Sequence, residues 1–132
     1  FLTCPISGTF DSIVSNPPFF TGGLLAPDSR RAAARHEDSL LPPAAFMRRA
    51  AALLAPGGTV CVIIPSDRVA DWTFAAGISG LKAADICELT TRPDAAPKRA
   101  VITFSRAAGA TTRRSLALNS ETYKSLTSQF YL

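Results

Sequence analysis

The sequence contains no run of about 18 apolar residues, and no basic segment followed by an apolar stretch and a cleavage site, so it predicts neither a membrane-spanning helix nor a secreted protein. It has a single histidine and three cysteines, Cys4, Cys61 and Cys87, which lie far apart and do not have the spacing of metal ligands. We therefore expect no bound metal, reduced thiols and a cytoplasmic location.

A second absence concerns cofactors. No Gly-x-Gly occurs anywhere in the chain, although that motif forms the turn that holds a nucleotide cofactor after the first strand of a Rossmann-like fold. Pro56-Gly57-Gly58 does not replace it, because these glycines close a predicted helix and open a strand. Residues 1–9 are too few to contain further strands, and we expect them to be a truncated start.

The composition is that of one folded domain with a mild excess of basic residues. The 132 residues are 47% hydrophobic and carry a net charge of +4, which permits nucleic-acid binding without requiring it. Taken alone, each basic cluster is better explained as a solvated surface. The clusters are Arg30, Arg31 and Arg35; Arg92, Lys98 and Arg99; and Arg113 with Arg114.

Apolar patterning predicts an α/β fold. A helix is expected to start at Pro42 or Pro43, carry Phe46 and Leu54 on its apolar face and end at the glycine pair. The next segment, 59–64, is continuous, β-branched and apolar, as in a parallel strand covered on both faces. We expect the remaining elements to be a helix from Asp67 to Ala76, a strand from Leu81 to Thr90, a basic loop from Arg92 to Arg99, a hairpin strand from Ala100 to Ser105, a mobile link at 106–115, and a tail at 116–132 with a short strand and a helix.

A rigid turn follows the first predicted strand. Ile13 and Val14 are β-branched and apolar, which indicates a strand packed on both faces. Asn16 then precedes Pro17 and Pro18, each of which fixes its own φ at about −65° and disfavours helix for the residue before it. Because the two prolines have no N–H, the carbonyls of Asn16 and Pro17 are free to accept hydrogen bonds.

This turn suits the recognition of an amine on a flat aromatic base. The Asn16 side-chain oxygen and the Pro17 carbonyl can each accept one N–H, and Phe19 offers a ring, since stacking a base on an aromatic side chain contributes about 1–3 kcal/mol. Asn16-Pro17-Pro18-Phe19 resembles the catalytic motif of Rossmann-like, S-adenosylmethionine-dependent amino-methyltransferases. A plain turn that caps the strand end explains these four residues equally well.

With the whole chain in view, the sequence resembles the C-terminal half of the bacterial tRNA1(Val) (adenine(37)-N6)-methyltransferases. The residues that carry this similarity are Phe10-Asp11, Asn16 to Phe20, Arg31, Ala34-Arg35-His36, Asp38-Ser39-Leu40, Leu53 to Gly58, Ile63-Ile64-Pro65, Arg92-Pro93, Pro97-Lys98-Arg99, Tyr123, Leu126-Thr127 and Phe130-Tyr131-Leu132. The resemblance implies that residues 1–132 are the C-terminal part of a single methyltransferase domain. Its parallel sheet would finish with an antiparallel hairpin and edge strand, and the N-terminal cofactor half would be absent.

The resemblance also implies the roles of individual residues, with S-adenosylmethionine as cofactor and tRNA as partner. Adenine N6 would attack the sulfonium methyl in line while two acceptors hold its N–H groups, after the base is turned out of its stack. The catalytic residues would be Asn16, Pro17, Pro18 and Phe19, and the substrate contacts Phe20, Arg35, His36, Arg92, Lys98 and Arg99. Only Asn16 of this chain would touch the cofactor, so we expect the isolated chain to be inactive.

Two other functions stay open. Methyltransferases that act on glutamine in release factors also use Asn-Pro-Pro, usually with tyrosine at the position of Phe19, so the target could be an amine on a protein or a small molecule. Alternatively, the chain could be an RNA-binding module without catalysis. An assay of methyl transfer to total tRNA and to release factor distinguishes tRNA methylation from methylation of a protein amine. Binding of tRNA without any response to the cofactor would indicate the RNA-binding module.

Overall fold

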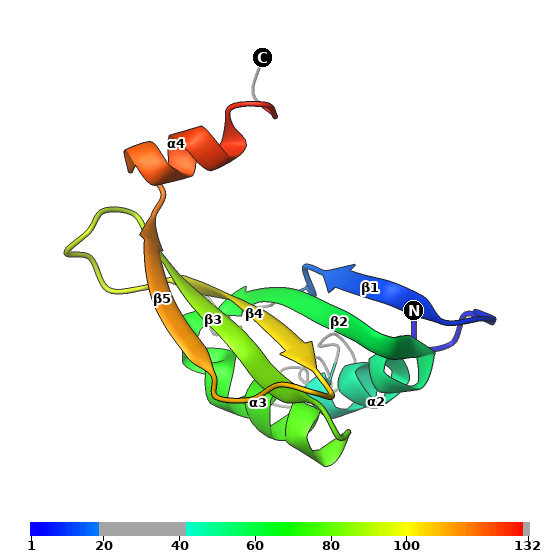
Figure 1. The fold of residues 1–132 in the computed structure, drawn as a ribbon. Coiled ribbons are helices and arrows are strands. Elements are labelled where there is room, and N and C mark those ends of the chain that lie inside the picture. Colours follow the sequence, from blue (N-terminus) through cyan, green and yellow to red (C-terminus); the bar gives the residue numbers. More distant parts are fainter. Residues whose placement is uncertain (19–41, 131–132) are drawn as a thin grey trace, which may run out of the picture.

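The computed structural model describes residues 1–18 and 42–130, which form a five-stranded mixed sheet with two helices packed on one face and a third, C-terminal helix standing off beyond the last strand (Figure 1). The strand order across the sheet is β1-β2-β4-β3-β5. The elements are β1 Phe10–Ser15, α2 Pro43–Leu53, β2 Leu54–Pro65, a 3-10 turn η1 at Ser66–Arg68, α3 Val69–Ile78, β3 Lys82–Thr90, β4 Arg99–Ser105, β5 Thr112–Ala117 and α4 Glu121–Thr127. The described helices include none that is long and apolar enough to span a membrane.

The α/β fold expected from the sequence is confirmed, but the antiparallel strand does not lie at the edge. β1 pairs with β2 and β3 pairs with β5 in parallel, whereas β4 runs antiparallel to both β2 and β3 and lies between them. The chain crosses from β2 through α3 to β3 and leaves one strand position vacant, which β4 fills when the hairpin turns back. All strands except β4 therefore point the same way.

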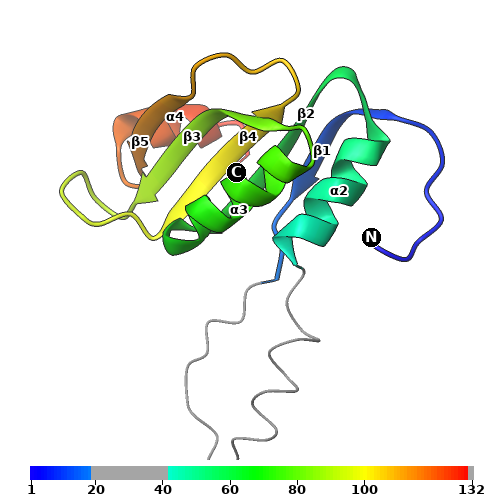
Figure 2. The ribbon, with the colours of Figure 1, turned by 90° about the horizontal axis from the view of Figure 1, so that it is seen from below.

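The hydrophobic core lies between the sheet and the two helices α2 and α3, which cover the same face (Figure 2). Along β2, the side chains of Val60, Val62 and Ile64 are buried against these helices and alternate with half-buried ones. Ile102 and Phe104 continue the buried row on β4. Strands with one covered face show this alternation of period 2, so the prediction that residues 59–64 are covered on both faces is wrong for the described residues.

Helix α2 begins at a proline, and an arginine side chain binds carbonyls at its C-terminal end. Pro43 stands at its first position, where the missing N–H costs nothing, as the sequence predicts. The last carbonyls of a helix have no partner within it, and here the guanidinium of Arg106 donates to the carbonyls of Ala51 and Leu54 at 2.6 and 3.2 Å. Arg106 thus joins the end of β4 to the end of α2.

The glycine pair after α2 lies inside strand β2, not between the helix and the strand as expected. The register of β1 on β2 jumps from Phe10–Leu54 to Ser12–Thr59, so residues 55–58 form an irregular stretch in the ladder. Gly57 has φ +76°, and a Cβ on Gly58 would lie 3.0 Å from the carbonyl oxygen of Asp11. The glycines permit the close approach of β2 to β1.

We expect Gly58→Ala to lower the free energy of unfolding by about 1–3 kcal/mol, because the added methyl must push backbone atoms of β1 and β2 apart. Gly109→Ala is the matched control, since a Cβ there meets nothing within 4 Å and its φ is not positive. Urea unfolding measures both. Equal free energies of unfolding for the two variants would mean that β1 and β2 adjust to the added methyl group without loss of stability.

Three further expectations need correction. Residues 112–115, predicted as part of a mobile link, belong to β5, which pairs with β3 along its whole length. The helix expected from Asp67 begins as the 3-10 turn, and its α-helical part is α3. Strand β1 is not buried on both faces, because it lies at the sheet edge and leaves Val14 75% exposed. The tail helix is confirmed as α4, where the Ser120 hydroxyl accepts the N–H of Tyr123 at 3.1 Å.

Candidate functional site

Asn16, Lys98 and Arg99, three of the predicted site residues, lie at one edge of the sheet. Because β1, β2, β3 and β5 are parallel, their carboxyl ends lie at the same edge, and the antiparallel β4 starts there. The Asn16 turn follows β1, the loop at 91–98 follows β3, and Arg99 is the first residue of β4. Ligands of parallel α/β sheets bind outside the carboxyl ends of the strands, so this edge is the candidate site.

The Asn16 turn is anchored from its middle. Pro17 is buried, whereas Asn16 before it and Pro18 after it are exposed. The burial of Pro17 and the fixed φ of both prolines limit the motion of the turn. The Asn16 side chain is therefore presented to solvent at the edge by a turn that needs little further ordering when a ligand binds.

Lys98 and Arg99 are fixed beside this turn by backbone hydrogen bonds. The Lys98 N–H donates to the carbonyl of Leu89 at 3.1 Å, and the Lys98 carbonyl accepts the N–H of Ser66 at 3.2 Å. Arg99 pairs with Pro65 of β2 and with Leu89 of β3. Since β2 separates Arg99 from β1, its backbone lies about two strand spacings, on the order of 10 Å, from the strand that carries Asn16.

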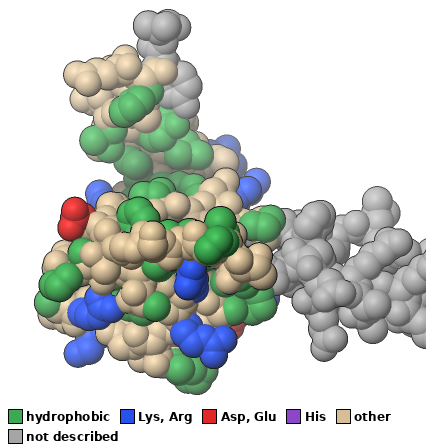
Figure 3. Space-filling model, turned by 90° about the vertical axis from the view of Figure 1, so that its right-hand side faces the viewer, with side chains coloured by type: hydrophobic (Ala, Val, Ile, Leu, Met, Phe, Trp, Pro, Cys, Tyr) green, Lys and Arg blue, Asp and Glu red, His purple; other side chains and the backbone are tan. Residues whose placement is uncertain are grey.

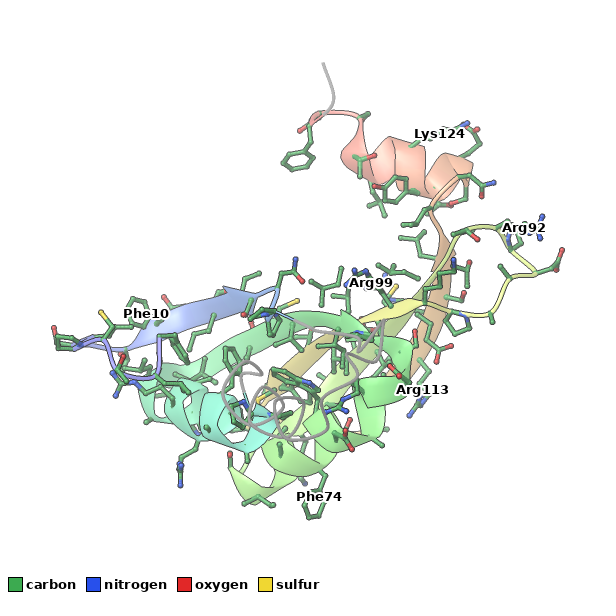
Figure 4. All side chains as sticks on the ribbon, turned by 180° about the vertical axis from the view of Figure 1, so that it is seen from behind. Phe10, Phe74, Arg92, Arg99, Arg113 and Lys124 are labelled. Atoms are coloured by element: carbon green, nitrogen blue, oxygen red, sulfur yellow. The ribbon has the colours of Figure 1, made fainter. Side chains whose placement is uncertain are left out.

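The remaining basic residues of the described part of the chain do not form one cluster. Figure 4 shows Arg99 next to the strands, Arg92 out on the loop and Arg113 on the other side of the sheet. Arg114, the neighbour of Arg113, is paired: its Nε and Nη2 donate to the Asp85 carboxylate at 3.0–3.1 Å, which raises the pKa of the guanidinium. Within residues 42–130, Lys98 and Arg99 are the members of the basic clusters that lie next to the site.

Four predicted site residues, Phe19, Phe20, Arg35 and His36, lie outside the described residues, as do Arg30 and Arg31. Their proposed roles in stacking and tRNA contact stay predictions. Among the described residues, no group of three or more His, Cys, Asp or Glu side chains could hold a metal ion.

Sequence reasoning missed the part that Ser66 plays at this edge. No side-chain hydrogen bond caps η1. Ser66 instead ties the end of β2 to the basic loop through its N–H. Because every residue except proline has a backbone N–H, the residue type at position 66 could not indicate this hydrogen bond.

The described residues do not fit a complete site for S-adenosylmethionine. The fold places Asn16 at the edge where such a cofactor binds, but the chain has no Gly-x-Gly turn to hold it. What the edge provides is an exposed amide, a rigid turn and two exposed cations on a hydrogen-bonded backbone. These groups can bind a flat polar ring and a phosphate. They therefore suit the part of a site that binds the substrate, and not the part that binds the cofactor.

No protein-family model matches the chain. Over 129 residues it is 37% identical to a tRNA1(Val) (adenine(37)-N6)-methyltransferase of Bacteroides fragilis, a match that covers 93% of this chain and 54% of the relative. The protein of the same name from Phocaeicola vulgatus is 38% identical, over 93% of this chain and 55% of the relative. The chain thus spans about half the length of these curated relatives.

Solved structures agree with the fold. A predicted O-methyltransferase from Agrobacterium tumefaciens superposes with a TM-score of 0.58 at 22% identity, covering 85% of this chain and 44% of that one. A putative class I S-adenosylmethionine-dependent methyltransferase from Listeria monocytogenes gives 0.58 at 15% identity, over 98% of this chain and 43% of the other. The chain therefore has the fold of about half of a class I methyltransferase.

Proposed function

Because the chain is homologous to the tRNA1(Val) (adenine(37)-N6)-methyltransferases over about half of their length, we propose that it carries the substrate-base part of an enzyme that methylates adenine N6 in tRNA. The observation on which this rests is the position of Asn16. It is exposed, fixed by a buried proline and located at the carboxyl edge of a parallel sheet. A tRNA substrate places the reaction in the cytoplasm.

Asn16 and Pro17 act by positioning the amine. The side-chain oxygen of Asn16 and the carbonyl of Pro17 each accept one N–H of the adenine amine, which orients the nitrogen lone pair away from the ring plane. The base must leave its stack to reach them, and Phe19 would then hold its face. S-adenosylmethionine supplies the methyl group, and its binding residues, apart from Asn16, come from outside this chain.

A chimera tests the function directly. Residues 1–132 replace the matched segment of the Bacteroides fragilis relative, and the chimera is incubated with labelled S-adenosylmethionine and total tRNA. We expect labelled N6-methyladenosine when the tRNA is digested to nucleosides. Label in release factor instead of tRNA would identify the protein-glutamine activity. A folded chimera that binds S-adenosylmethionine but labels neither would refute the proposal and favour a module that only binds RNA.

Lys98 and Arg99 are expected to contact tRNA phosphates. Each phosphate contact contributes about 0.7–0.9 to the slope of log K against log salt concentration, so the Lys98→Ala/Arg99→Ala double variant should flatten that slope by about 1.4–1.8. The measurement is a salt series of tRNA binding by the 132-residue chain.

The control for this prediction removes the same charge elsewhere. Arg48 lies exposed on α2, and Lys82 begins β3 at the opposite edge of the sheet, so Arg48→Ala/Lys82→Ala should leave the slope nearly unchanged. If both double variants flatten the slope equally, the effect is one of net charge and not of a binding site.

A further inference from the structure

The C-terminal helix α4 stands away from the rest of the domain, at the same edge of the sheet as Asn16. It follows the carboxyl end of β5, on the side of the molecule that carries the loop at 91–98 (Figures 1 and 4). We call residues 118–130, which contain α4, the arm. Because β1 and β5 are the two outer strands of five, the base of the arm lies four strand spacings, about 19 Å, from the strand that carries Asn16.

Hydrogen bonds hold the base of the arm. The Leu118 N–H donates to the carbonyl of Thr90 at 2.9 Å, which ties the arm to the end of β3. The Ser120 hydroxyl donates to the carbonyl of Ala117 at 2.6 Å and accepts the N–H of Tyr123 at 3.1 Å. These bonds fix the direction in which α4 leaves the sheet, and every residue of α4 is at least partly exposed.

The arm presents apolar side chains to solvent. Leu118, Leu126 and Phe130 are 40%, 61% and 82% exposed. Figure 3 shows hydrophobic side chains (green) on the projecting part and Lys and Arg side chains (blue) below it. The chemistry at Asn16 does not use these groups. Several exposed apolar side chains on one small element indicate a surface that another molecule covers.

The charge beside the arm indicates the kind of molecule. The loop at 91–98 and Arg99 together carry three basic residues and one acidic residue, a net charge of +2, and all four are exposed. Within α4, Lys124 pairs with Glu121 at 2.6 Å, so the helix adds no net charge. A second copy of the chain would bring the same positive edge, which opposes self-association. A single-stranded nucleic acid combines the two features that this surface fits, negative phosphates and flat apolar rings.

We propose that the arm is a second contact for the RNA substrate, in which the ring of Phe130 stacks on an unpaired base. The RNA then runs along the carboxyl edge of the sheet from Asn16 to the arm, and the basic loop at 91–98 faces the phosphates between the two bases. The arm takes a loop or another single-stranded segment, because a base paired within an RNA helix does not offer its face. The inference rests on the proposed function for the identity of the RNA and of the base at Asn16.

The test measures binding of total tRNA by the 132-residue chain and its variants. Phe130→Ala should weaken binding by about fivefold or more, because the stacking surface is lost. It should leave the slope of log K against log salt concentration unchanged, because no phosphate contact is lost. Phe130→Trp should bind as the parent does, whereas Phe130→Leu, which is apolar but has no ring, should bind as weakly as the alanine variant.

Phe74→Ala is the matched control. Phe74 is 72% exposed on α3, and Figure 4 shows it on the opposite side of the molecule from α4, so its loss should leave the affinity unchanged. The fluorescence of the buried Trp72 verifies that the alanine and leucine variants are folded. In a second measurement, Phe130→Ala should weaken binding of an RNA hairpin with an unpaired loop and leave binding of a fully paired RNA of the same length unchanged.

Three results would overturn the proposal. They are an unchanged affinity of Phe130→Ala for tRNA, full binding by Phe130→Leu, which would indicate an apolar protein partner, and a dimer of the chain in analytical ultracentrifugation that Phe130→Ala dissolves. The chimera separates this proposal from the proposed function. Methylation of tRNA with a KM that Phe130→Ala leaves unchanged would refute the role of the arm alone. Weaker RNA binding by Phe130→Ala in a chimera that methylates no RNA would support the arm and refute the proposed function.

Discussion

Replacing Asn16 with alanine should reduce methyl transfer to tRNA in the chimera by about 10²–10³-fold, the usual cost of removing one fixed polar group that acts on the reacting atoms. In the proposed function, the amide oxygen of Asn16 accepts one of the two N–H groups of the target amine. Without it, the nitrogen lone pair is no longer aimed, and the base can rotate in its pocket. Binding of tRNA should change little, because phosphate contacts dominate affinity.

The matched control is Asn119→Ala. Asn119 is the other asparagine of the sequence and lies exposed in the turn between β5 and α4, so its loss should leave the rate within about twofold, as for a surface substitution. The rates come from initial velocities at saturating tRNA, with binding measured separately by filter retention. A rate of the Asn16 variant within a few-fold of the parent would remove Asn16 from the catalytic site and leave the turn a structural cap.

Phe104→Ala should have the largest effect on stability. Phe104 is fully buried near the end of β4, between Val60 of β2 and Ala83 of β3. Removing a buried phenyl ring costs about 3–5 kcal/mol, which is a large part of the about 5–15 kcal/mol that stabilises a typical domain. The single tryptophan, Trp72, is buried in the same core, so its fluorescence reports unfolding in urea.

The same substitution at an exposed site gives the reference value. Phe74→Ala removes an equal number of atoms from a side chain that is 72% exposed, and should change the free energy of unfolding by less than about 0.5 kcal/mol. Similar values for the two variants would mean that the core around Phe104 is loosely packed. A variant at position 104 that is unfolded without urea would agree with the prediction at its upper limit.

The sequence predicted those elements whose signal is local. The helix after Pro43, the β-branched run of β2 and the hairpin of β3 with β4 all follow from periodicity and breakers, and each is present. The position of Asn16 at a carboxyl edge followed from the alternation of strands and helices. Residues 1–18 and 42–130 contain most of the predicted site, including Arg92, Lys98 and Arg99.

What the sequence could not predict depends on contacts between distant residues. β5 has the polar sequence of a loop, and it becomes a strand because its backbone pairs with β3 and Arg114 binds Asp85. The position of β4 between β2 and β3 depends on which strand edges are unpaired when the hairpin forms. The exposure of Val14 has a similar origin, because a β-branched residue is equally suited to a buried strand and to an edge that another chain segment covers.

The hydrogen bonds of Lys98 have one more consequence. The loop at 91–98 leaves the sheet after Thr90 and returns at a residue whose N–H and carbonyl are both bonded to neighbouring strand ends. Everything between Thr90 and Lys98 is therefore free to vary in length and composition while the strands stay in register. Under the proposed function, the loop is a modular segment through which the contacts with RNA can change without redesign of the domain that carries it.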